Sequence, residues 1–64
     1  MSVEEYINRG IERRDSNNYN GAISDFSAAI RIKPDYDFDY FQRAYAKDEL
    51  KNYYGAINDY SKAI

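Results

Sequence analysis

The groups in this sequence that could do chemistry are limited to charged and hydroxyl side chains, because it contains neither histidine nor cysteine. Catalysis would then depend on carboxylates, Lys, Tyr or Ser held in a pocket. The acidic pair Asp48 and Glu49 is adjacent in sequence, so on a helix the two carboxylates point to different parts of the surface. No phosphate-binding loop or nucleophile-elbow motif is present. The sequence therefore predicts a protein that is not an enzyme, and this acidic pair is interpreted as a solvated helix end.

Three aspartates, Asp35, Asp37 and Asp39, alternate with aromatic residues and suggest either a strand or a loop that binds a cation. They lack the Gly and the distal Glu that complete an EF-hand loop. The usual Cys and His ligands of zinc are missing as well. The simpler interpretation is the start of a helix with acidic capping residues, followed by aromatic side chains that pack. We therefore predict no metal and no cofactor.

A basic and an acidic residue recur together in the two halves of the chain. Arg9 and Asp25 in the first half correspond to Arg43 and Asp59 in the second, at the same separation. This repetition predicts an ion pair, either within each half or between Asp25 and Arg43. The alternative is that these are unrelated solvated charges. If such a pair is exposed, its contribution to stability is under about 1 kcal/mol.

Four helices are predicted to position these side chains. The stretch from Tyr19 to Ile30 has apolar residues at i, i+3, i+4, i+7, i+10 and i+11, which form one stripe on a helix. Asn18 is a plausible N-cap, and Asp35 or Asp37 is expected to cap the third helix. Pro34 ends the second helix, and turns are expected at residues 16–18 and 51–52. The expected helices run from about Val3 to Asp15, Tyr19 to Ile32, Tyr36 or Asp37 to Leu50, and Tyr53 to Ile64.

The second predicted helix recurs at the end of the chain, 34 residues later. When residues 1–30 are aligned on residues 35–64, eleven of the thirty positions are identical. A period of this length is typical of stacked supersecondary units. We therefore predict an all-α fold, a helical-repeat solenoid of two stacked antiparallel hairpins. It forms a single domain, 1–64, with a first repeat at 3–34 and a second at 37–64 that is truncated in its second helix.

The spacing of aromatic and small residues resembles the tetratricopeptide repeat family, whose units are helical hairpins. The first repeat has Tyr6, Gly10, Tyr19, Ala22, Phe26, Ala29 and Pro34 at the family positions, and the second has Tyr40, Ala44, Tyr53, Ala56, Tyr60 and Ala63. Two kinds of departure stand out. Arg9 and Arg43 replace a large apolar residue, and Arg13 and Lys47 replace a frequent Tyr. We expect these side chains either to weaken the hairpin or to bury their stems and bring their charged ends to the surface.

The resemblance implies that the first helix of each hairpin lines a concave groove for a protein partner. Here that face is mostly apolar and aromatic, so the expected ligand is an apolar or amphipathic peptide or helix held by aromatic anchors. Ile7, Ile11, Phe41 and Tyr45 stand where family members that clamp a carboxylate have Lys and Asn, so no such clamp is expected. The alternative is that these rings form ordinary core or subunit packing. The predicted peptide-binding residues are Ile7, Asn8, Ile11, Phe38, Phe41, Gln42 and Tyr45.

The end of the chain poses a separate problem, because repeat arrays need about three units and a polar cap to stand alone. Here the last helix ends without a cap, which leaves an apolar face open. Either the chain belongs to a longer array, or it self-associates as a structural unit, and we predict a dimer or larger assembly. The predicted self-association residues are Leu50, Tyr53, Tyr54, Ile57, Tyr60 and Ile64.

Net charge and hydropathy limit the classes of partner and the location that the sequence predicts. The net charge of −2 and the sequence pI of about 4.9 argue against nucleic acid, which usually requires a basic face. No run of about eighteen apolar residues is present, so we predict neither a signal peptide nor a membrane span, and a cytoplasmic location. The sequence as a whole predicts a non-catalytic protein–protein interaction module, with self-association as the alternative.

Overall fold

The computed structural model describes residues 1–63, and within them every regular element is a helix. The bounds are α1 Val3–Asp15, α2 Tyr19–Ile32, α3 Asp37–Glu49 and α4 Tyr53–Ala63. The predicted all-α class and the four helices are confirmed, and the first two helices match their predicted ends. Ile64, the expected last residue of the fourth helix, lies outside the described residues.

The helix starts follow from local capping. Ser2 and Glu5 form a capping box at α1, in which each side chain bonds the backbone N–H of the other. Asn18 Oδ1 accepts a hydrogen bond from the Gly21 N–H at 3.1 Å, so the predicted cap is confirmed, and Asn52 does the same for Gly55 in α4. The prediction that an aspartate caps α3 is wrong. Tyr36 occupies the cap position without a side-chain bond, and Asp37 is already the first helical residue.

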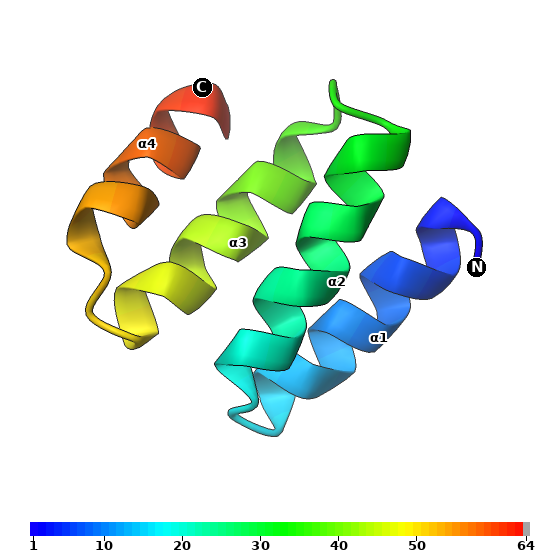
Figure 1. Ribbon diagram of the computed structural model, residues 1–64, viewed down its shortest axis with the longest axis horizontal. Coiled ribbons are helices and arrows are strands. Elements are labelled where there is room, and N and C mark those ends of the chain that lie inside the picture. Colours follow the sequence, from blue (N-terminus) through cyan, green and yellow to red (C-terminus); the bar gives the residue numbers. More distant parts are fainter. Residues whose placement is uncertain (64) are drawn as a thin grey trace.

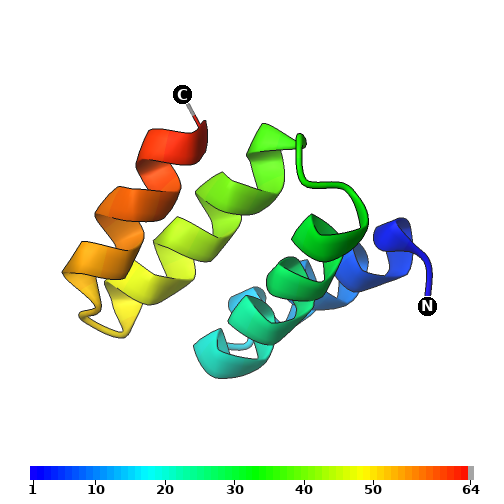
Figure 2. The same ribbon diagram turned by 45° about the horizontal axis from the view of Figure 1, so that its top comes forward.

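The helices pack as two antiparallel hairpins in a flat stack. Contacts link α1 to α2, α3 to α4, and α2 to α3, and the four helices lie in chain order across the molecule (Figure 1). The same order holds after a turn of 45° (Figure 2). The molecule measures 29 × 26 × 13 Å, so its third dimension is little more than one helix diameter. Each flat face is therefore close to solvent, and α1 and α4 form the two ends of the stack.

The core lies where α2 meets α3. Ala22, Phe26 and Ala46 are fully buried there, and Ile11 and Phe38 pack against them together with Tyr19 and Ile23. Gly10 faces the same ring from α1, since a Cβ added to it would lie 2.9 Å from Phe26 Cζ. Small residues thus let the helix axes approach, and one large ring fills the space that remains.

None of the helices within residues 1–63 is long and apolar enough to cross a membrane.

Candidate functional site

Residues of the predicted peptide-binding face line two separate hollows. The N-terminal hollow is lined by Val3, Glu4, Ile7, Asn8, Lys33 and Tyr36. The aromatic hollow is lined by Arg14, Asp15, Phe41, Gln42 and Tyr45. Five of the seven predicted peptide-binding residues therefore line a hollow, two in the first and three in the second. Whether they bind a peptide stays a prediction.

The other two predicted anchors, Ile11 and Phe38, are partly buried against the core cluster. Ile11 packs there from α1 and Phe38 from α3. Their side chains help to hold the two hairpins together. The surface that remains open to a ligand is therefore narrower than the sequence pattern indicates.

The aromatic hollow presents two rings one helical turn apart on α3. Phe41 is 51% exposed and Tyr45 is 40% exposed. Each ring meets another edge to face: Phe41 meets Tyr60 with centroids 5.5 Å apart, and Tyr45 meets Tyr19 at 6.4 Å. These contacts fix the rings in place while part of each remains open to solvent.

Charged and polar groups border the aromatic hollow. Arg14 donates hydrogen bonds to Gln42 Oε1 and to Asp15 Oδ1, so it links α1 to α3 across the edge of the hollow. Burial raises the pKa of Tyr60, and the carboxylate of Asp48 adds to this effect. The Tyr60 hydroxyl therefore remains a neutral donor at physiological pH.

The predicted self-association residues form an exposed surface at the C-terminal end of the stack, which we call the end face. Leu50 is 42% exposed, Tyr53 54%, Ile57 62% and Tyr54 90%. Tyr60 is half-buried through its contact with the ring of Phe41, so the end face adjoins the aromatic hollow. Ile64 lies outside the described residues.

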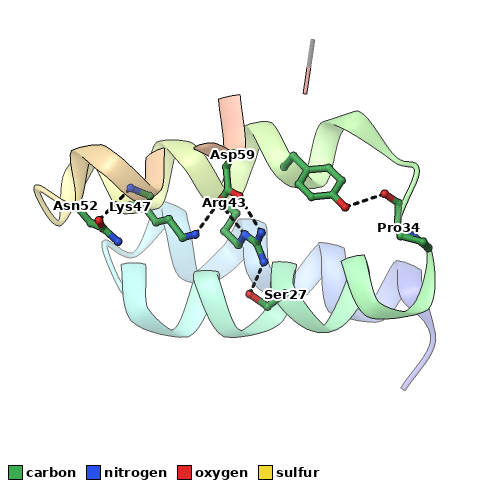
Figure 3. A network of polar contacts seen from close by, with 8 residues as sticks. Ser27, Pro34, Arg43, Lys47, Asn52 and Asp59 are labelled. Atoms are coloured by element: carbon green, nitrogen blue, oxygen red, sulfur yellow. Dashed lines mark hydrogen bonds and ion pairs between the residues drawn. The ribbon is translucent and has the colours of Figure 1, made fainter. Parts of the chain in front are cut away.

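The second hairpin contains a buried ion cluster (Figure 3). Arg43 donates to both oxygens of Asp59 at 2.8 Å, and Lys47 Nζ lies 2.9 Å from the same carboxylate. Arg43 also donates to Ser27 Oγ at 3.1 Å, which joins this hairpin to the first. Burial acts to raise the pKa of Asp59, but the hydrogen bonds from Arg43 and Lys47 together outweigh it and hold the pKa below its usual value.

The first hairpin has the same cluster, in which Arg9 Nη2 lies 2.7 Å from Asp25 Oδ1 and Arg13 Nη1 lies 3.5 Å from Asp25 Oδ2. The predicted pairing within each half is confirmed. Asp25 and Asp59 are almost completely buried, so the limit for exposed pairs does not apply to them. The charged ends of Arg9 and Arg43 point to these buried carboxylates instead of reaching only for solvent.

The additional cations, Arg13 and Lys47, were not predicted as members of the clusters. Each stands four residues after the arginine of its own pair, which places both cations on one face of the helix. That spacing was available in the sequence and could have identified them.

Asp39 is a buried acid that sequence reasoning treated only as part of the acidic helix start. Its side chain is fully buried, and neither carboxylate oxygen has a hydrogen-bond partner in the described part of the chain. The equivalent Glu5 of the first repeat reaches the backbone N–H of Ser2, but Asp39 is one methylene shorter and makes no such bond. Burial raises the pKa of Asp39 to about 6, despite the opposing charge of Lys33.

Within residues 1–63 no three His, Cys, Asp or Glu side chains gather as metal ligands. No family model, curated protein or solved structure matches this chain. The resemblance to tetratricopeptide repeats therefore rests on the residues named above and stays a prediction.

Proposed function

We propose that the chain is a non-catalytic protein–protein interaction module whose aromatic hollow binds a peptide or helix. The observation that supports this most directly is the pair Phe41 and Tyr45, which expose apolar surface from neighbouring turns of one helix. Exposed aromatic rings with a polar border are typical of binding hot spots.

The spacing of the two rings suggests the form of the ligand. Rings four residues apart on α3 suit a partner that presents apolar side chains at i and i+3 or i+4, as an amphipathic helix does. Arg14 and Asp15 at the border place both signs of charge beside the rings. A ligand with polar residues flanking its apolar anchors therefore fits the hollow better than a wholly apolar one.

A displayed library of amphipathic helical peptides tests the proposal. Peptides selected on the intact chain are expected to lose at least about tenfold in affinity with Phe41→Ala or Tyr45→Ala. Ile32→Ala is the matched control, because Ile32 is an exposed apolar residue that lines neither hollow. The proposal fails if no peptide is enriched, or if both ring variants bind as tightly as the control does.

Self-association is the second candidate function, and the extent of apolar exposure on the end face favours it. Tyr53, Tyr54 and Ile57 are all more than half exposed on one short helix. In this role the chain is a structural assembly unit whose main partner is its own copy. Light scattering over a range of concentrations is expected to show a dimer or larger species, and a monomer that persists to millimolar concentration would exclude it.

A cytoplasmic location completes the proposal. It is supported by the lack of cysteine, which fits a reducing compartment.

A further inference from the structure

The first hairpin provides an internal template for how the end face is covered. The two hairpins are repeats, so each residue of α3 and α4 has a counterpart 34 positions earlier in α1 and α2. The first hairpin has a neighbour, because α3 packs on α2 and contributes Ala46 and Phe38 to the core. The second hairpin has no such neighbour among the described residues.

Counterpart positions differ in exposure according to this neighbour. Ile23 is half-buried beside α3, but the identical Ile57 is 62% exposed. Tyr19 is likewise half-buried, but the identical Tyr53 is 54% exposed. The residues are the same, so the difference comes from the helix that covers one hairpin and not the other.

The template also shows which end-face residues a covering helix leaves in solvent. Tyr54 and Leu50 correspond to Asn20 and Ser16, which are exposed in the first hairpin although α3 is present. Tyr54 is the most exposed large apolar residue, yet it lies outside the covered surface. The predicted self-association set therefore divides into a covered part, with Tyr53, Ile57 and Tyr60, and an uncovered part.

A polar contact in the first hairpin indicates a further feature that a helix covering the end face would have. Ser27 accepts a hydrogen bond from Arg43 of the covering α3. Its counterpart Ser61 is exposed, and its hydroxyl donates to the Ile57 carbonyl of its own helix at 2.9 Å. A helix that covers the end face as α3 covers α2 would place an arginine beside Ser61.

The α1 helix of a second copy does not have the required surface. At the positions of Phe38 and Ala46, α1 has Glu4 and Glu12, which are both exposed. Placing α1 on the end face would bury these carboxylates against apolar side chains, which is unfavourable without a paired charge. Head-to-tail stacking of identical copies is therefore disfavoured.

We infer that the end face binds one helix with the surface chemistry of α3: an aromatic residue, an arginine five residues later and a small residue three after that, as in Phe38, Arg43 and Ala46. This inference rests on the end face being an interface. It names as the occupant a helix of a different protein, because α1 of an identical copy lacks this surface and α3 of a copy already packs on its own α2. The surface it uses is centred on Ile57 and Tyr53, and it excludes Tyr54.

A synthetic peptide of residues 35–50, labelled and blocked at both ends, is the probe. It is expected to bind the intact chain, and the same peptide with Ala46→Glu, which reproduces the α1 residue, is expected to bind at least about tenfold more weakly. Ile57→Lys in the chain is expected to weaken binding by a similar factor. Tyr54→Ala and Asn58→Lys are the matched controls and should leave binding unchanged, because their counterparts Asn20 and Ser24 are exposed beside α3.

Fluorescence anisotropy of the peptide and light scattering of the chain separate the outcomes. If the chain self-associates but the peptide does not bind, or binds Ile57→Lys as well as wild type, the inference fails while self-association stands. If the peptide binds Ile57→Lys as tightly as wild type, this would also mean that the peptide displaces the native α3 instead of covering the end face. If the chain neither self-associates nor binds the peptide, both ideas fail.

Discussion

Replacing Asp39 with Asn removes the charge from the one fully buried acid that lacks a partner among the described residues, and we expect it to stabilise the protein near pH 7. The pKa of Asp39 is raised from 3.8 to about 6. At roughly 1.4 kcal/mol per pKa unit, keeping this carboxylate ionised costs about 3 kcal/mol of folding free energy. A first-turn carboxylate regains about 0.3–1 kcal/mol from the helix dipole. The expected net gain for Asp39→Asn is therefore about 2–3 kcal/mol, a large part of the stability of so small a domain.

The pH dependence gives the clearest readout. The folded state holds the proton of Asp39 more tightly than the unfolded state does, so the stability that protonated Asp39 contributes is lost as the pH rises from about 4 to above 6. Asn does not titrate, so the advantage of Asp39→Asn should be full above about pH 7 and vanish below about pH 4. Urea denaturation followed by far-UV circular dichroism at several pH values measures both quantities.

Asp37→Asn is the control, because Asp37 lies in the same first turn of α3 but is exposed. It should change the free energy of unfolding by no more than about 1 kcal/mol, through loss of the dipole interaction. The reasoning about Asp39 is refuted if Asp39→Asn destabilises the protein at pH 7, or if its effect is the same at pH 4 and pH 8.

Three further substitutions test the packing, the ion cluster and the turns. Ala22→Leu should overpack the fully buried contact and cost about 1–3 kcal/mol in urea denaturation, whereas Leu at the exposed Ser24 of the same helix should change stability little. Asp59→Asn leaves two cations without their buried counter-charge and should lower the free energy of unfolding by about 3–5 kcal/mol at pH 7. The difference in stability between variant and wild type should shrink as the pH falls through the lowered pKa of Asp59. An unchanged melting temperature would contradict this prediction. Lys51→Asn should raise the free energy of unfolding by up to about 1 kcal/mol, because Lys51 has φ of 65° and the equivalent turn position already has Asn17. If urea denaturation shows no gain, the turn is unstrained.

Most of the fold could be predicted because the signals are local and repeated. The apolar spacing from Tyr19 to Ile30 identifies a helix, and its recurrence identifies the hairpin. The N-terminus of α3 was harder, because Asp35 and Asp37 both have the side chain of a good capping residue and only Tyr36 separates them. A shift of one residue decides whether an aspartate caps the helix or lies within its first turn.

The candidate site was only partly predictable. Ile11 and Phe38 belong to the same predicted face as Phe41 and Tyr45, but the first two pack against the core and the last two are exposed. Helical periodicity predicts the direction in which a side chain points. It does not predict how closely the neighbouring helix approaches at that residue. The burial of Asp39 could not be predicted either, because Glu5 at the equivalent position of α1 is exposed.

The identities and the differences between the two repeats have separate physical roles. Asp25 and Asp59 are both buried and ion-paired, although only the first hairpin has a covering neighbour. Each carboxylate is therefore paired within its own hairpin, and Arg43 of the second cluster bonds Ser27 of the first hairpin in addition. The differences fall where the hairpins have different neighbours: α3 has Ala46 at the position where α1 has the exposed Glu12. The first hairpin is covered by α3 and carries the exposed Glu12 on α1, whereas the second hairpin packs on α2 through Ala46 and has Ile57 exposed among the described residues. Replacing Glu12 with Ala should thus make α1 more like α3 and promote head-to-tail association, which light scattering would detect as larger species than the wild type forms.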